Sequence, residues 1–429
     1  MEPASGRRAS SMTSHRLPLV AGFLALLTPL QYLVPSVNGA EIRWGLFRFN
    51  LGARVSAEYT DNENLSESNP QPDFTLEAGP TLNGGLRLAP TVVWLERPVL
   101  EVSANYGIKY SLKNDTWDET FSSPINVTLS IPVNLYGWNM ILADNFTFSN
   151  EPLETTFAVN REKVTDFQND ASVSIGRTSG RLGITFAATR SDKWTQDDPD
   201  LEDTTYNFSI TPAYYFRDNY SLFWRNAYSI SELADPTQRD STGYSSELGL
   251  NGQLTPSLSG SISMGLSHTT LEGEVFPGDP NDPFGGVFDR RVGGKDNIDG
   301  ISSTIALNYT HPLRPNTSFG LSFARSPGVT TLLKDADITE STSVTLSIAH
   351  RLSRTITLAP TISWTRLEEI SSNPNAQKVD YIQITMGLTR QFTRKLNGGI
   401  NYTYQTRDSN QFDQSYDVNK VTVSLNYSF

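Results

Sequence analysis

Histidine, cysteine and paired carboxylates are the residue types with which this chain could catalyse a reaction or bind a metal. It has no cysteine and only four histidines, which excludes thiol chemistry and Cys-ligated metals. His15 lies near the N-terminus, and His268, His311 and His350 each alternate in phase with neighbouring apolar residues. A hydrolase would need a histidine beside Ser, Asp or Asn, and neither a G-x-S-x-G motif nor a metal-binding histidine pair occurs. The sequence therefore predicts no enzyme, with no catalytic, cofactor-binding or metal-binding residue.

Carboxylates gather in segments rich in turn-forming residues. All the charged residues of segment 192–203 except Lys193 are acidic, and segment 60–73 has no basic residue. Such carboxylates could bind Ca²⁺ or Mg²⁺, but the calcium-loop pattern D-x-[DN]-x-[DN]-G does not occur, so a solvated acidic rim is favoured. The formal net charge of −12 argues against nucleic acid as a partner, because phosphate binding needs a basic surface.

Alternation of apolar and polar residues runs through most of the chain after residue 45. In the last segment, 421–429, every odd position is apolar and every even position is Ser, Thr or Asn. The pairs 343–352 with 355–364, and 382–388 with 396–405, repeat the pattern on either side of a short turn. Period two predicts strands with one apolar and one polar face. Their length of about ten residues exceeds that of typical soluble strands and suits a tilted bilayer crossing.

Short turns and longer polar loops alternate between these strands. We place the turns near residues 89–97, 137, 178–181, 217–219, 255–257, 312–317, 353–354 and 393–395. We place the loops near 60–73, 113–122, 151–165, 192–203, 234–242, 271–299, 327–339, 367–378 and 407–417. This order predicts an all-β fold, a transmembrane antiparallel up-and-down β-barrel of about eighteen strands, with sixteen as the alternative. Loop 271–299 could either fold into the barrel or stay outside it.

The N-terminal segment has the features of an export signal. Arg7, Arg8 and Arg16 precede the apolar run 17–27, which is too short for a stable membrane helix. Cleavage is expected after Gly39 or Ala40. We therefore predict a signal peptide at residues 1–40 and one barrel domain at 41–429, located in the outer membrane of a Gram-negative bacterium.

The polar face of the strands would line the inside of such a barrel if Phe429 faces lipid. That face is mainly Ser, Thr, Asn, Gln, Gly and Ala, and charges on it are sparse. The pore-lining candidates are Glu101, Lys109, Arg225, Arg351 and Lys420. Uncharged hydrogen-bonding groups suit a hydrated solute such as a sugar chain, although any water-filled barrel would use the same residues. Both interpretations stay open.

Two segments resemble known proteins. The ending with Tyr427 and Phe429 resembles the closing strand of bacterial outer-membrane barrels, which implies a signal read by the barrel assembly machinery. Residues 51–65, LGARVSAEYTDNENL, resemble the opening strand of the β-barrel porin 2 family. That resemblance implies a passive aqueous channel for exopolysaccharide or capsular polysaccharide, without catalytic residues. Its implied partners are outer-membrane lipid, lipopolysaccharide and periplasmic polysaccharide-export proteins. The alternatives are a surface receptor or adhesin acting through acidic extracellular loops, and a structural barrel.

Overall fold

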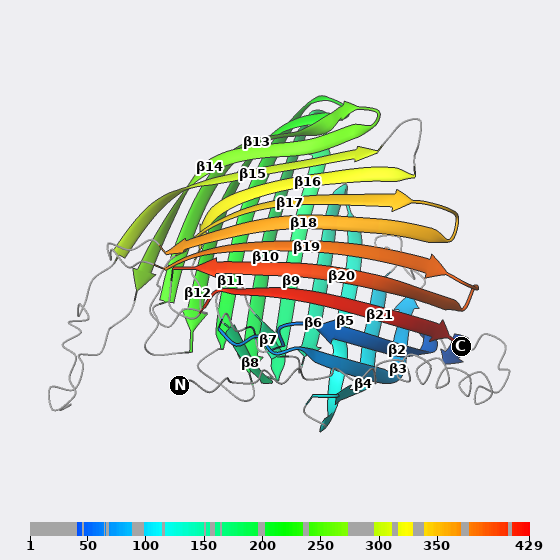
Figure 1. The fold of residues 1–429 in the computed structure, drawn as a ribbon. Helices are drawn as coiled ribbons and strands as arrows, with labels where there is room; N and C mark the ends of the chain where they lie inside the picture. The colour runs from blue at the N-terminus through cyan, green and yellow to red at the C-terminus, as the bar shows by residue number, and fades with distance from the viewer. Residues whose placement is uncertain are drawn as a thin grey trace, which may run out of the picture. The chain divides into compact units, whose positions relative to one another are not determined.

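A computed structural model gives the fold of the chain, and Figure 1 shows it as a ribbon. It describes residues 41–44, 47–63, 65, 68–87, 98–113, 116–149, 152–154, 159–163, 165–195, 202–234, 240–272, 296–310, 316–328, 339–369, 377–410 and 414–429. The predicted signal peptide, His311 and nearly all of loop 271–299 lie outside these ranges. Within them the regular structure is entirely β, and no helix is long and apolar enough to cross a membrane.

The strands follow one another along the whole described chain. Their bounds are β1 Glu41–Trp44, β2 Phe47–Thr60, β3 Asp73–Arg87, β4 Val99–Ser111, β5 Thr116–Leu135, β6 Trp138–Ser149, β7 Pro152–Glu154, β8 Val159–Lys163, β9 Asp166–Ser179, β10 Leu182–Thr195, β11 Asp203–Arg217, β12 Tyr220–Leu233, β13 Asp240–Thr255, β14 Leu258–Glu272, β15 Asp296–Thr310, β16 Thr317–Gly328, β17 Thr339–Arg351, β18 Ile356–Glu369, β19 Lys378–Gln391, β20 Leu396–Ser409 and β21 Tyr416–Ser428. Most have 12 to 16 residues, more than the roughly 9–11 that a tilted bilayer crossing needs.

Antiparallel pairing closes the sheet into a barrel. Each of the strands β2–β6 and β9–β21 pairs with the next, β6 pairs with β9, and β21 returns to pair with β2. The wall therefore has eighteen strands, and the predicted strand number is confirmed. Strand β1 pairs with residues 47–50 of β2, just beyond the stretch that β21 covers, and β7 and β8 form a separate hairpin.

Two predicted loops differ in the structure. The loop expected at 113–122 is much shorter, because β5 already begins at Thr116 and pairs with β4 from Ser111 onward. The pairing of β5 is irregular opposite Asn105, next to Pro124, which has no N–H for the ladder. The loop expected at 151–165 contains β7 and β8.

The turn between β5 and β6 shows how short the connections at one end of the barrel are. Tyr136 and Gly137 are its two central residues, and both have positive φ, 52° and 80°. This is the geometry of a type I′ hairpin turn, whose twist matches that of the flanking strands. Most of the wider connections lie at the other end; the connection from Arg87 to Val99, between β3 and β4, is an exception. We call the two ends the turn end and the loop end.

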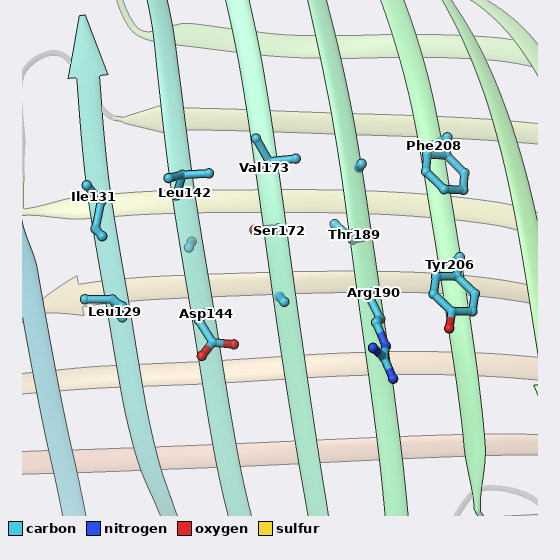
Figure 2. A pocket seen from close by; sticks show the side chains of 13 residues that line it. Leu129, Ile131, Leu142, Asp144, Ser172, Val173, Thr189, Arg190, Tyr206 and Phe208 are labelled. Carbon is cyan, nitrogen blue, oxygen red and sulfur yellow. The ribbon is translucent and has the colours of Figure 1, made fainter.

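The apolar surface of the barrel is on its outside. Buried apolar residues are few, whereas large ones such as Met264 and Leu266 are 62% and 69% exposed. A hollow of about 400 Å³ lies on the outer wall, and Figure 2 shows side chains that line it, including Leu129, Leu142 and Phe208. A soluble protein would not expose so much apolar surface, but a barrel surrounded by lipid must.

Candidate functional site

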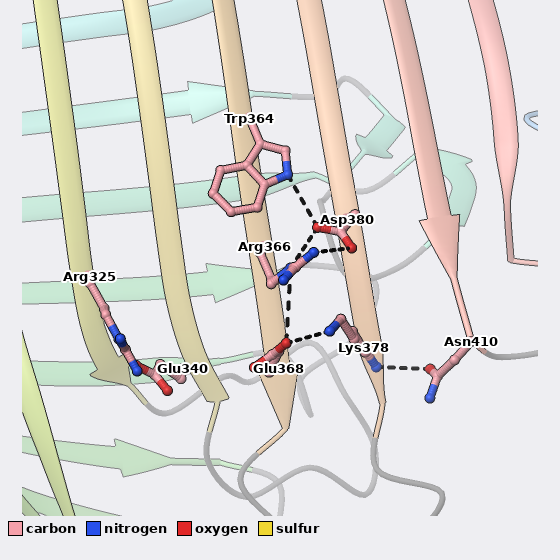
Figure 3. A network of polar contacts seen from close by, with 8 residues as sticks. All are labelled: Arg325, Glu340, Trp364, Arg366, Glu368, Lys378, Asp380 and Asn410. Carbon is pink, nitrogen blue, oxygen red and sulfur yellow. Dashed lines mark hydrogen bonds and ion pairs between the residues drawn. The ribbon is translucent and has the colours of Figure 1, made fainter.

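The inner face of the barrel is the candidate site, and the strand register defines it. Residues that are Cα partners in neighbouring strands direct their side chains to the same face of the sheet. One face is therefore shared by the row Arg351, Thr357, Thr389, Gly399 and Ser424. Outer side chains such as Trp364 take the alternate positions, and in Figure 3 the opposite wall passes behind them. Serine, threonine, asparagine and glycine dominate the inner face, as the alternation predicts.

All five pore-lining candidates fall on this inner face, but the structure does not bring them together. Lys109 is the direct partner of Glu77, and Arg225 is the partner of Glu247. The others lie on β4, β17 and β21, at different heights and several strands apart. Within the described residues, Glu101 and Arg351 form no ion pair.

Charged residues that the sequence reasoning missed also lie on the inner face. Glu58 accepts a hydrogen bond from Thr422 (3.0 Å) and pairs with Lys420, with 3.5 Å between Oε1 and Nζ. Glu77 accepts a hydrogen bond from Ser56 at 3.3 Å. The expectation of sparse charge on this face was therefore wrong near the seam between β2 and β21. The same alternation could have found these carboxylates, because they occupy inner positions in their strands.

A second charged pair lies on the opposite wall. Arg225 Nη1 is 3.9 Å from Glu247 Oε2, and Ser263 donates to the same carboxylate oxygen at 3.3 Å. Strands β12 and β13 are half of the wall away from the β2–β21 seam in strand order. Both pairs are partly exposed, so screening by water limits what each contributes to stability. Together the two pairs place fixed positive and negative charges along the interior of the barrel.

An ionic network lies on the outer face at the loop end of β16–β19 (Figure 3). Arg366 donates to both oxygens of Asp380, at 2.8 and 3.0 Å, and Trp364 Nε1 donates to the same carboxylate at 3.2 Å. Lys378 pairs with Glu368 at 2.7 Å. These charges lie next to an aromatic ring typical of the membrane interface, where polar headgroups are available. Alternation in the sequence predicts that these side chains point outward, but it does not predict which of them pair with one another.

The two histidines that the structure describes, His268 and His350, make contacts on the outer face and do not form a catalytic arrangement. His268 Nδ1 is 2.8 Å from Asp299, and Thr270 Oγ1 lies 3.4 Å from His268 Nε2. The Thr270 hydroxyl donates instead to Asn297 at 2.9 Å, and the Asp299 side chain is 89% exposed. A nucleophile needs its proton directed at the base, and the base needs a well-held acidic partner. His350 contacts Thr317 at 2.7 Å.

The last strand, which carries Tyr427, is part of the closing ladder of the barrel. Tyr427 is the Cα partner of Ala53 and Leu396 in the closing ladder, and β21 ends one residue before Phe429.

Among the residues that the structure describes, no group of three or more His, Asp or Glu could hold a metal ion.

Comparison with known proteins gives similar folds only. No family model matches the sequence, and no curated protein matches it. Similar solved structures include Pseudomonas aeruginosa OccK2 (OpdF) in complex with glucuronate, at 11% identity over 89% of this chain and 98% of that chain, with a TM-score of 0.46. Pseudomonas aeruginosa OpdQ has 11% identity over 90% and 100%, with a TM-score of 0.46. Acinetobacter baumannii OccAB3 has 10% identity over 89% and 99%, with a TM-score of 0.44. These values say nothing about a substrate of this chain.

The wall itself identifies the class of protein. It is antiparallel, closed and even in strand number, and apart from the connection between β3 and β4 its turns at one end are short, whereas most connections at the other end are wider. Its exterior is apolar and its inner face polar. These are the properties of barrels that span the outer membrane of Gram-negative bacteria. The chain is therefore an outer-membrane β-barrel.

Proposed function

We propose that the protein is a porin, a passive aqueous channel through the outer membrane. The observation that carries the proposal is the closed wall of eighteen strands with a hydrogen-bonding inner face. A wall of this size, with strands about 4.8 Å apart and tilted by about 40°, has a radius of about 18 Å. Barrels of sixteen to eighteen strands leave room for water, with side chains along the wall. We propose that Glu101, Lys109, Arg225, Arg351 and Lys420 line this channel.

A polysaccharide on its way out of the cell is the solute we propose. Hydroxyl and amide side chains on the inner face can exchange hydrogen bonds with a sugar chain without holding it tightly. The resemblance of residues 51–65 to the β-barrel porin 2 family supports the same direction of transport. The partners of this proposal are periplasmic export proteins at the turn end, and lipopolysaccharide around the outer network of Figure 3.

Planar-bilayer recording of the purified full-length barrel tests the channel. We expect stable, ohmic single-channel currents, with transient blocks when neutral oligosaccharides are added. A correctly folded protein that gives no current would contradict the channel and favour a receptor, adhesin or structural barrel. Deletion of the gene in its host tests the solute, since export of surface polysaccharide should fall and return on complementation.

Assembly is the role we propose for Tyr427 and Phe429. Deleting Phe429 should slow insertion by the assembly machinery while leaving refolding in detergent unchanged. Pulse-chase folding in cells, followed as a gel shift between folded and unfolded protein, measures the first effect. Equal folding rates in cells for the two proteins would contradict the role.

A further inference from the structure

Charge is distributed unevenly along the barrel axis. At the turn end we count the three outermost residues of each wall strand and the turn residues, where the structure describes their side chains. The basic residues there are Arg48, Arg177, Arg181, Arg217, Arg351, Arg354, Arg390, Arg394 and Lys395, and the acidic ones are Glu101 and Asp218. The same zone at the loop end is mostly acidic, although it includes Lys109, Lys113, Lys193, Lys378 and Arg407. A chain with a net charge of −12 therefore presents a basic mouth at one end.

A polar hollow of about 530 Å³ lies at this basic mouth. Arg351, the last residue of β17, and Arg354, in the turn to β18, line it together with Thr389, Asn397, Ser424 and Asn426. The register places Thr389, Asn397 and Ser424 on the inner face. The turn is held in shape by Ser353, whose Oγ accepts hydrogen bonds from the N–H groups of Thr355 (3.2 Å) and Ile356 (3.1 Å). The hollow therefore opens into the interior and has a defined wall.

Three arginines line the hollow: Arg390 lies over the Phe392 ring at 5.1 Å, whereas Arg351 and Arg354 have no internal counter-charge. Among the described residues, neither the Arg351 nor the Arg354 side chain makes an ion pair or a hydrogen bond. This differs from Arg225 and Lys420, which face Glu247 and Glu58 on the same inner surface. A guanidinium group has planar donors that match a carboxylate or phosphate. Two unpaired guanidinium groups beside Ser, Thr and Asn thus offer charge recognition next to groups that bind hydroxyls.

We propose that this hollow is an anion-binding subsite that receives a carboxylate-bearing sugar unit as it enters from the periplasm. The proposal rests on the proposed function, because it narrows the class of transported solute from polysaccharides in general to acidic polysaccharides. Short turns face the periplasm in barrels of this class, so the basic mouth is the entrance for an exported chain. Basic charge at the entrance raises the local concentration of the anion, and the acidic loop end repels it outward once it has passed.

The headgroup of an anionic phospholipid carries similar chemistry and is the other source to test. The position of the hollow disfavours it, since Thr389, Asn397 and Ser424 face the interior and not the membrane. Outward basic residues such as Arg177, which stacks over the Trp138 ring at 5.7 Å, are better placed for lipid headgroups.

Current block by a galacturonate trimer tests the subsite, with maltotriose as the neutral probe. We expect half-block at a lower trimer concentration from the turn end than from the loop end. Replacing both arginines (Arg351→Gln with Arg354→Gln) removes two charge-assisted contacts and should raise the half-blocking concentration about ten-fold or more. Block by maltotriose should be nearly unchanged. The control is Arg394→Gln, which removes one positive charge from the next turn, at a residue that does not line the hollow.

The orientation of the barrel in the bilayer can be determined with a single introduced cysteine, because the chain has no cysteine of its own. An Asn219→Cys variant, labelled with biotin in the β11–β12 turn, reports which chamber the turn end faces when streptavidin reduces the current. Equal block from both ends, or equal block of the double variant and the Arg394→Gln control, would overturn the subsite while leaving the channel intact. Absence of any current would instead remove the proposed function.

Equilibrium binding provides a measurement that does not depend on insertion. Calorimetric titration of the folded barrel in neutral detergent should detect binding of the galacturonate trimer that the double arginine variant loses. Titration with a short-chain phosphatidylglycerol distinguishes the lipid source. Tighter binding of that lipid than of the trimer, lost in the same variant, would overturn the sugar assignment.

Discussion

Replacing Asp144 by leucine should stabilise the barrel, although it removes a charge. Asp144 points outward between its partners Leu129 and Ala171, at the edge of the outer hollow (Figure 2), and its Oδ1 is buried with no hydrogen-bond partner among the described residues. At about 2.5 Å of depth per residue of tilted strand, it lies about 15 Å from the level of Trp138. This is inside an apolar band about 25 Å tall. Removing an unsatisfied buried polar group should gain about 1–3 kcal/mol.

Asp170 gives the matched control, because it lies at the same height on the other face. It is the partner of Asn145, points inward, and accepts hydrogen bonds from Gln168 and Ser191. Asp170→Leu should therefore lose about 1–3 kcal/mol, since two hydrogen bonds are removed and an apolar side chain is placed in water. Urea unfolding in lipid vesicles, followed by tryptophan fluorescence and linear extrapolation, measures both variants. If Asp144→Leu destabilises and Asp170→Leu does not, the assignment of lipid to the outer face and water to the inner face is refuted.

Backbone contact and interior charge give two further tests. A Cβ on Gly79 would collide with the carbonyl oxygen of Tyr106, so Gly79→Ala should cost about 1–3 kcal/mol. Gly387→Ala, whose Cβ would meet no atom closer than 3.5 Å, should be neutral or stabilising in the same unfolding assay. Glu247→Gln leaves the charge of Arg225 unbalanced, so reversal potentials in a salt gradient should shift toward anion selectivity, and Arg225→Gln should shift them the opposite way. Equal stability of the glycine variants, or the same shift for both charge variants, would contradict these arguments.

Strand positions could be predicted from the sequence because alternation is a local property. A shift of one residue in the register would move every side chain of a strand to the other face. The alternation in 421–429 therefore also predicted that side chains as distant as Arg225 point inward. Irregular pairing could not be foreseen in the same way. The stretch after Thr116 pairs with β4 although Pro124 interrupts its ladder, and that depends on what its neighbour tolerates.

Charge pairing at the candidate site could not be predicted, because it depends on closure. Lys420 has the inner phase on its own strand, but only the β21–β2 seam places it beside Glu58, near the other end of the chain. The basic mouth was equally hidden. Its arginines are scattered singly along the sequence, and they become one feature only when every short turn is assigned to the same end of the barrel.

Polar contacts at the loop end of the seam add to the β2–β21 ladder that closes the barrel. Asp61 Oδ1 accepts a hydrogen bond from the backbone N–H of Asn419 at 2.7 Å, and its Oδ2 accepts one from Asn419 Nδ2 at 2.8 Å. Asn62 donates to the carbonyl of Asp417 at 2.9 Å. These bonds join residues from the two ends of the chain, and a shift of the seam by one residue would break all of them. Since the same shift would turn the polar face of β21 toward lipid, the seam contacts and the alternation specify one register together.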